Sequence, residues 1–394
     1  PLVHISPALI ITTTYLTHTF INNNLMKIAC TQENLSQGLS LVSNVAGKHP
    51  HLPILNNILL QVDKEGLLLI ATNLEIGIKT RVRGKVEDTG SFTVQAKLFS
   101  DFIHSLSDGN LLLQQKENLL LVEDDNQQTK LKGETAQDFP LIPEVVGQNP
   151  SMVNGRALIK ALETVVFAAS TDESRPELHA VLFVLHEKRL TLVATDSYRL
   201  AEASLALEKE TEGTYSLIVP IRTAQQVLRA FQGLSEEETV EIRTNDNQVQ
   251  FSAGQTEIVS RLVAGQYPDY KQIIPVNFST TITIKNSDLV RGLRSTSLFC
   301  QPGINDVKFL FVPETSEIQL RAQNATAGDN LTRLPAETVG SAGEIVFNYR
   351  YLLEGALHLD SQDATIEVND ASGPAVLRGK EQKDFLYLVM PIKQ

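Results

Sequence analysis

The same order of secondary-structure signals recurs three times along residues 26–394, and this repeat constrains the fold more than any other feature. Each copy begins with an amphipathic helix followed by strands; a further strand then leads into a second helix, and more strands close the copy. The pair Thr72-Asn73 precedes Thr195-Asp196 by 123 residues, and Asp196 precedes Asn324 by 128 residues. The spacing predicts three consecutive domains of one plan: residues 26–148, 149–276 and 277–394.

Helices and strands are predicted from the period of the apolar residues. Leu35, Leu39 and Val42 have helical spacing, whereas Val240 and Ile242 alternate as in a strand with one face in a core. The expected helices are 33–45, 97–106, 156–170, 221–233, 287–299 and 348–359. The expected strands are 54–62, 67–72, 76–82, 91–94, 111–115, 119–123 and 129–133; 181–186, 189–194, 200–207, 215–219, 240–244, 248–252 and 257–263; 307–312, 318–322, 344–347, 364–368, 374–378 and 385–390.

This pattern predicts an α+β fold in which the two helices of each copy share one side of a sheet. The breaks between copies carry proline-marked segments, 139–143 and 267–270, which leave a sheet rather than run through its middle. Tandem copies of such a unit are expected to continue their sheets into one curved antiparallel sheet with the helices on its inside. Closing that sheet removes the edge strands that would otherwise aggregate.

Residues 1–25 differ in composition from the rest of the chain. They contain no Lys, Arg, Asp or Glu, so they lack the basic segment of a secretory signal, and His4, His18 and several threonines dilute any spanning helix. We expect an extension that is not part of the fold, with Met26 as the natural first residue.

Charge is distributed unevenly along the chain. The formal net charge is -12, yet the six expected helices carry eight basic and five acidic residues. The pairs Arg156/Lys160, Arg222/Arg229 and Arg291/Arg294 each lie on one helix face. A mildly basic helical surface on an acidic body suits sequence-independent contact with the phosphates of double-stranded DNA. Ordinary solvated helix faces are the alternative interpretation.

The sequence offers no set of residues for catalysis, for a metal or for a cofactor. The serine motif of a nucleophile elbow is absent, and residues 373–380 have the wrong glycine spacing for a phosphate loop. His49 and His51 lack a nearby third ligand. The two cysteines, Cys30 and Cys300, stand far apart, which favours a reducing cytoplasm over a disulfide framework or zinc site. No segment has the apolar length of a membrane span.

Residues 192–200 run from an apolar strand through Thr195-Asp196-Ser197-Tyr198 and then, at Arg199-Leu200, into a second apolar pattern. A polar turn between apolar strands can rim a pocket, and we interpret this one as part of a docking site for peptides of other proteins. Taken in isolation, the stretch is more typical of an ordinary hairpin turn.

The repeat, together with four motifs, resembles the bacterial DNA polymerase III β subunit family, the sliding clamps, over residues 26–394. The motifs are Leu52-Pro53-Ile54-Leu55, Ala194-Thr195-Asp196 with Arg199-Leu200, Tyr267-Pro268-Asp269-Tyr270, and Val389-Met390-Pro391-Ile392. The resemblance implies three clamp-type domains, a head-to-tail homodimer that closes a ring around duplex DNA, and no catalytic activity. It also implies docking of the polymerase III catalytic subunit, the clamp loader and repair proteins by a short apolar peptide.

Site residues follow from the resemblance by matching position. The peptide pocket, between the second and third domains, would use Leu178, Thr195, Ser197, Tyr198, Arg199, Leu200, Pro268, Gln272, Ile273, Asn348, Tyr351, Pro374, Leu388, Met390, Pro391 and Ile392. Within it, Arg199 and Asn348 are expected to orient the peptide. The DNA contacts would combine the loop residues Lys48, His49 and Arg175 with the helical cations Lys97, Arg156, Lys160, Arg222, Arg229, Arg291 and Arg294. The dimer contact would join Leu298 and Phe299 to Thr129 and Leu131.

Two other classes of function stay open at this level. A repeat-built surface or carbohydrate-binding protein is the first, and its support is the apolar stretch at the start of the chain. An enzyme with an unfamiliar site is the second, although no nucleophile, base and stabiliser can be assembled from the sequence.

Overall fold

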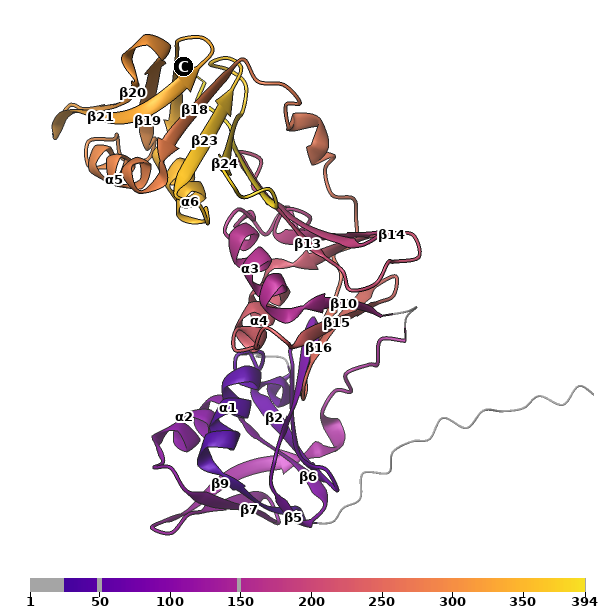
Figure 1. Ribbon diagram of the computed structural model, residues 1–394. Helices are drawn as coiled ribbons and strands as arrows, with labels where there is room; N and C mark the ends of the chain where they lie inside the picture. Colours follow the sequence, from indigo (N-terminus) through magenta and orange to yellow (C-terminus); the bar gives the residue numbers. More distant parts are fainter. Residues whose placement is uncertain (1–24, 48–51, 147–149, 394) are drawn as a thin grey trace, which may run out of the picture. The chain divides into compact units, whose positions relative to one another are not determined.

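The computed structural model describes residues 25–47, 52–146 and 150–393, and Figure 1 shows their helices and strands. The predicted extension 1–25 therefore lies outside the described residues except for Leu25, which is exposed. Contacts divide the chain into two compact units. The first lies within Pro1–Ile70 and Arg81–Phe139, and the second within Ala71–Thr80 and Pro140–Gln394. The domain limits predicted from the repeat stay a prediction.

The structure repeats the predicted order of elements in each copy. Residues 26–148 contain β1 (Lys27–Thr31), α1 (Gln32–Val42), the 3-10 helix η1 (Pro53–Asn56), β2 (Asn57–Asp63), β3 (Gly66–Thr72), β4 (Ile76–Val82), β5 (Lys85–Asp88), β6 (Gly90–Gln95), α2 (Ala96–Ser105), β7 (Asn110–Lys116), β8 (Leu119–Glu123), β9 (Gln128–Thr135) and η2 (Ala136–Asp138). Residues 149–276 contain β10 (Ser151–Asn154), α3 (Gly155–Val166), β11 (Ala180–His186), β12 (Arg189–Thr195), β13 (Arg199–Ala206), β14 (Thr214–Pro220), α4 (Ile221–Phe231), β15 (Thr239–Thr244), β16 (Gln248–Ala253), β17 (Thr256–Arg261) and η3 (Tyr270–Ile273).

Residues 277–394 contain β18 (Thr280–Lys285), α5 (Asn286–Ser297), β19 (Asp306–Val312), η4 (Pro313–Thr315), β20 (Glu317–Asn324), β21 (Gly328–Val339), β22 (Gly343–Asn348), α6 (Tyr349–Leu357), β23 (Asp363–Val368), β24 (Ala375–Gly379) and β25 (Phe385–Val389). The α+β expectation is confirmed, with two helices in each copy and antiparallel strand pairing between neighbours.

In the first unit, strands follow the order β3-β2-β6-β9-β8-β7-β1-β5. Helices α1 and α2 pack on each other and bury an apolar stripe that includes Leu35, Leu39 and Phe99. The buried side-chain amide of Gln32 donates a hydrogen bond to the carbonyl of Ile103 at 2.8 Å, so the start of α1 is tied to the end of α2.

In the second unit, one sheet runs β10-β15-β16-β17 and continues to β4, and another runs β14-β11-β12-β13-β25-β24-β23-β18-β21-β20-β19-β22. Figure 1 shows α3 and α4 together on one side of the strands of the second copy, and α5 and α6 together in the third. The core of the second copy lies between its sheets, where the fully buried rings of Phe183 and Phe251 are 5.7 Å apart.

The second and third copies share a sheet through one strand pair. Strand β13 runs antiparallel to β25, with Leu200 opposite Leu388 and Ala203 opposite Phe385. The backbone N–H of Ser204 extends the pairing by donating to the carbonyl of Asp384 at 2.8 Å. This pairing brings the polar 195–200 motif next to the end of the chain, 190 residues later in sequence at Met390.

Several predicted limits are wrong. The helices predicted to end at residues 45, 170 and 233 end at Val42, Val166 and Phe231. Buried residues such as Val45 and Ala168 continue the apolar period but belong to turns, so periodicity alone overextends the helix. The strand predicted at 54–62 begins as the 3-10 helix Pro53–Asn56, with the proline in its first turn.

Five strands were not predicted: β1, β5, β10, β18 and β21. Four of them have only four to six residues. Strand β21 contains Pro335, a residue that argues against a central strand. In the structure, Pro335 marks the point where the partner of β21 changes, because residues 328–335 pair with β20 and residues 336–339 pair with β18.

A glycine in α6 gives the first testable prediction. A Cβ atom added to Gly355 would lie 2.3 Å from Cδ1 of Tyr387, whose side chain is fully buried. Replacement by alanine favours the helix by about 1 kcal/mol but overpacks the core by roughly 1–3 kcal/mol. We expect Gly355→Ala to lower the urea midpoint of unfolding. The matched control is Gly233→Ala, where the added Cβ meets nothing within 4 Å. An unchanged urea midpoint for Gly355→Ala would contradict the close packing of Gly355 against Tyr387.

Candidate functional site

The turn between β12 and β13, residues 195–199, is held by its own side chains. Asp196 Oδ1 accepts hydrogen bonds from the backbone N–H groups of Tyr198 (2.9 Å) and Arg199 (3.0 Å). Thr195 Oγ1 donates to the carbonyl of Arg199 at 2.6 Å and accepts from the N–H of Ser197 at 3.2 Å. These bonds fix Ser197 in the left-handed region, with φ of 79°.

The turn after β3 in the first copy has the same hydrogen bonds. Asn73 Oδ1 accepts from the backbone N–H of Ile76, Thr72 Oγ1 donates to the carbonyl of Ile76, and Leu74 is left-handed with φ of 72°. The turn is therefore a feature of the repeat. What distinguishes the second copy is its residues, above all Arg199 at the position of Ile76.

An apolar cluster surrounds this turn in the second unit and spans the β13–β25 pair. Its buried members are Leu178, Ala180, Leu182, Val193, Leu200, Ile218, Tyr267, Tyr270, Val376, Leu386 and Leu388, and Met390 packs against them with Val184, Val263, Ile274 and Phe278. The structure thus brings together four residues predicted for the pocket: Leu178, Leu200, Leu388 and Met390.

The linker between the second and third copies contributes two buried tyrosines to the apolar cluster, which the sequence did not predict. Tyr267 and Tyr270 belong to the apolar cluster, whereas the predicted Pro268, Gln272 and Ile273 between and beside them are exposed. The two tyrosines belong to a motif of the family resemblance but are not among the predicted pocket residues. Their aromatic character beside Pro268 was the available signal.

Burial raises the pKa of both linker tyrosines above the usual value for a phenol, so they stay neutral. The same holds for the buried Tyr387 of β25, whose hydroxyl donates to the carbonyl of Tyr351 at 2.9 Å.

The side chain of Arg199 is 11% exposed and binds three separate elements. Its Nε donates to Asp196 Oδ2 at 2.9 Å, its Nη1 pairs with Glu354 on α6, and its Nη2 donates to the carbonyl of Phe167 at 2.9 Å. The guanidinium carbon lies 4.6 Å from the centre of the Tyr351 ring, which is a cation–π distance.

The remaining predicted pocket residues lie around this cluster with varied exposure. Asn348 caps α6, since its side-chain oxygen accepts from the backbone N–H of Arg350 at 3.0 Å. Tyr198 is 63% exposed, while its carbonyl accepts from the N–H of Met390 at 2.8 Å. Pro374, Pro391 and Ile392 are half-buried. Because buried leucines lie beside exposed Tyr198 and Ile273, the surface can offer apolar contact to a peptide.

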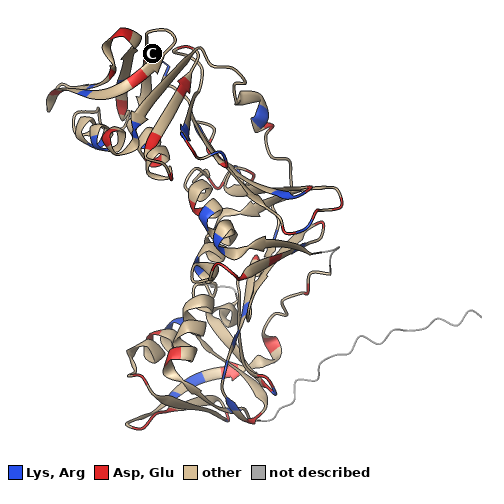
Figure 2. Cartoon of the chain, viewed as in Figure 1, with Lys and Arg blue, Asp and Glu red and all other residues tan. Residues whose placement is uncertain are grey.

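The predicted DNA-contact residues are mostly exposed and mostly ion-paired. Figure 2 shows Lys and Arg on α3, α4 and α5. The ion pairs of these residues on the helices are Lys97 with Asp101 (2.6 Å), Arg156 with Glu236 (2.8 Å), Lys160 with Asp360, Arg222 with Glu173 (3.1 Å) and Arg291 with Asp288 (2.8 Å). Arg229 donates to Gln226, and Arg294 is exposed. Lys48 and His49 lie outside the described residues.

Arg175, which was predicted to contact DNA, lies beside the 195–199 turn and has partners within the protein. Its Nη1 donates to Ser197 Oγ at 3.1 Å, and its Nε lies 3.4 Å from Glu177 Oε1.

The predicted dimer residues lie just after α5 and on β9. Leu298 is 75% exposed just after α5, and Phe299 is half-buried beside it. Thr129 and Leu131 are on β9, whose residues 128–132 pair with β8 on one side. In the described ranges, no strand pairs with the other side of that segment.

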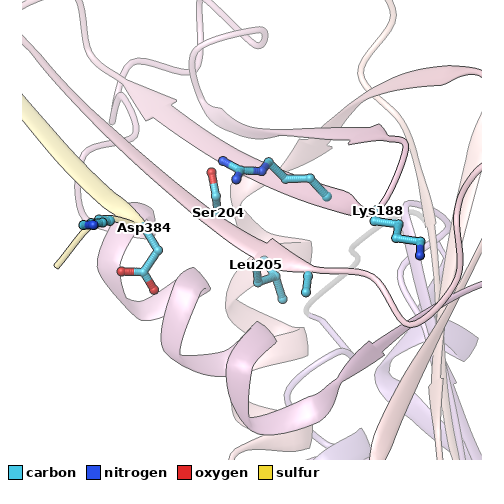
Figure 3. Close-up of a pocket in the computed structure, with 7 residues that line it drawn as sticks. Lys188, Ser204, Leu205 and Asp384 are labelled. Atoms are coloured by element: carbon cyan, nitrogen blue, oxygen red, sulfur yellow. The ribbon is translucent and has the colours of Figure 1, made fainter.

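A separate cavity of about 240 Å³ lies at the opposite end of the β13–β25 pair (Figure 3). Its lining residues are Lys188, Arg189, Ser204, Leu205, Ala206, Lys383 and Asp384. Within the described residues, no group of three or more His, Cys, Asp or Glu side chains is placed to hold a metal. Nor does that part of the chain contain a helix both long and apolar enough to cross a membrane.

Family models match the chain in three consecutive segments. The N-terminal domain of the DNA polymerase III beta subunit matches residues 26–143, the central domain matches 152–269, and the C-terminal domain matches 271–393. Among similar curated proteins, the beta sliding clamp of a Synechocystis species is 31% identical over 389 residues, covering 93% of this chain and 99% of that protein. The beta sliding clamp of Synechococcus elongatus is 31% identical over 372 residues, with the same coverage.

Solved structures give the same result. The sliding clamp of Bartonella birtlesii, solved bound to griselimycin, has a TM-score of 0.89 and 26% identity. The DNA polymerase III beta subunit of Thermotoga maritima has a TM-score of 0.88 and 25% identity. Each comparison covers 94% of this chain and 100% of the other.

The left-handed residue of the turn gives the second prediction. Ser197→Gly and Ser197→Ala both remove the hydroxyl that accepts from Arg175, but only glycine relieves the left-handed backbone. We expect the glycine variant to be more stable than the alanine variant by roughly 1 kcal/mol in urea unfolding. At Ser174, which does not have a positive φ, the same two substitutions serve as the control. At Ser174 the alanine variant is expected to be at least as stable as the glycine variant. If the glycine variant were the more stable one at both sites, the left-handed backbone of Ser197 would not be the cause.

Proposed function

Because this chain belongs to the bacterial DNA polymerase III β subunit family, the sliding clamps, we propose that it closes a ring around duplex DNA as a head-to-tail homodimer. As a sliding clamp it holds a polymerase on its template and so confers processivity. The role assigned to the chain is a topological tether, with the chemistry left to the polymerase. The proposal places the protein at the replication fork, in the cytoplasm.

Ring closure is supported by two strand segments that pair on one side only, as far as the described residues show. Residues 128–132 of β9 have a partner on one side, β8, and residues 328–335 of β21 have a partner on one side, β20. Exposed edges with unpaired N–H and C=O groups tend to pair with another chain. The exposed Leu298 and Leu331 near the second edge supply apolar surface for such a contact.

Sequence-independent DNA contact is supported by the helical cations. Their partners are mostly carboxylates in exposed ion pairs, and such pairs contribute only about 0–1 kcal/mol. A DNA phosphate can therefore replace a carboxylate partner at little cost. The overall charge of -12 limits this attraction and favours weak contact that lets the ring slide.

Partner docking is supported by the apolar cluster at the β13–β25 pair. It combines buried leucines with the adaptable Met390 and the exposed Tyr198, which suits a short apolar peptide. We assign this surface to the polymerase III catalytic subunit, the clamp loader and other proteins that carry such a peptide.

The ring gives a third prediction. Loaded by the clamp loader onto a nicked circular plasmid and passed through a gel-filtration column, the protein should elute with the DNA. It should be lost from the DNA once a restriction enzyme linearises the plasmid, because a ring slides off an end. Equal retention on both forms of DNA would refute topological binding.

A matched pair of variants tests the dimer contact in the same assay. Leu298→Asp places a charge on the proposed interface, so it should yield a monomer by native mass and no retention on the circle. Leu141→Asp, at a residue 92% exposed, should remain a dimer and be retained.

Docking gives a fourth prediction. Met390→Ala removes an adaptable side chain from the apolar cluster. We expect it to lower the affinity for a fluorescein-labelled peptide with leucine and phenylalanine anchors about tenfold or more, measured by fluorescence polarisation. The half-buried Met152 of β10 is outside the cluster, so Met152→Ala should bind like the wild type. Equal binding by both variants would remove Met390 from the site.

A further inference from the structure

We infer that Arg199 is a positioning residue that holds α6 of the third copy against the 195–199 turn of the second, and that it does not itself contact the docked peptide. The inference rests on the proposed docking function and departs from the sequence expectation that Arg199 orients the peptide. It concerns how the pocket obtains its shape.

The contacts of Arg199 leave little of its side chain for a ligand. Each nitrogen of the guanidinium group already has a partner, namely Asp196, Glu354 or the carbonyl of Phe167. One face covers the Tyr351 ring, and the Phe167 ring centre is 5.5 Å from the guanidinium carbon. With 11% of the side chain exposed, a peptide would have to displace these partners to reach it.

The partners of Arg199 come from both the second and the third copy. Asp196 and Phe167 belong to the second copy, whereas Glu354 and Tyr351 are on α6 of the third. The contact between Phe167 and His358, whose rings stack at 4.0 Å, lies beside the same junction. A planar guanidinium with a fixed fork of donors is suited to join elements in this way, which a flexible lysine is not.

Comparison of the repeats isolates the role of this side chain. The first copy builds the same turn with Ile76, which is 5% exposed, at the position of Arg199. The turn therefore forms without an arginine. The arginine supplies what the first copy does not have, a charged connection to a neighbouring helix.

Three predicted pocket residues depend on this connection. Tyr351 lies on the guanidinium, and Tyr198 is fixed by Asp196, the carboxylate that Arg199 binds. The carbonyl of Tyr198 then accepts from the N–H of Met390. Loss of the Arg199 contacts would loosen these three residues together. The pocket would widen, although no contact with the peptide itself would be removed.

The test is a double-mutant cycle in the full-length dimer. The probe is a fluorescein-labelled heptapeptide with leucine and phenylalanine anchors, made with either aspartate or asparagine between them. We expect Arg199→Gln and Glu354→Gln each to weaken binding about tenfold, and the double variant to be no weaker than the worse single one, because both break one contact. The loss should be equal for the two peptides. Arg350→Gln, an exposed arginine on the same helix, should bind like the wild type.

Other results would overturn the inference. Wild-type binding by Glu354→Gln together with a loss at Arg199→Gln that is larger for the aspartate peptide would show that Arg199 contacts the peptide. If thermal unfolding or native mass shows that Arg199→Gln does not fold, Glu354→Gln alone decides, and normal binding by that variant rejects the inference. Failure of the wild type to bind either peptide would instead reject the proposed docking function.

Discussion

The antiparallel pairing of β13 with β25 is the interaction on which the site depends. It places Leu200 opposite Leu388 and carries the sheet of the second copy into the third. Without it, neither copy would bury the apolar cluster, because Leu178 and Leu200 come from one copy while Val376 and Met390 come from the other. A partly buried ionic contact is located at the same junction, since the side chains of Arg199 and Asp196 are 11% and 14% exposed and that of Glu354 is 42% exposed.

That contact, between Arg199, Asp196 and Glu354, has a cost as well as a benefit. Removing charges from water is unfavourable, and replacing one partner leaves the others unpaired. Exposed ion pairs elsewhere, such as Arg156 with Glu236, involve no such penalty and contribute little to stability. The helical cations remain available for phosphates for this reason, whereas Arg199 is committed to the protein.

Much of the fold was predictable, because one period of apolar residues recurs in three copies and each copy supports the interpretation of the others. The errors in the predicted secondary structure have local causes. Helices were overextended where buried residues such as Ala168 continue into a turn, and β21 was missed because Pro335 stands where its pairing partner changes. In the site, the leucines and Met390 were predicted from the resemblance. Tyr267 and Tyr270 were missed, since burial of a linker depends on the sheet beneath it.

The sequence alone determined the repeat, the α+β plan and the position of a turn at Thr195-Asp196, since these depend on local spacing and on side chains that bond to their own backbone. The tertiary structure decided what Arg199 does. An arginine in a polar turn is compatible with solvent, with a peptide or with the protein itself. Only the pairing of β13 with β25, which brings Glu354 and Tyr351 within reach across more than 150 residues, selects the last of these.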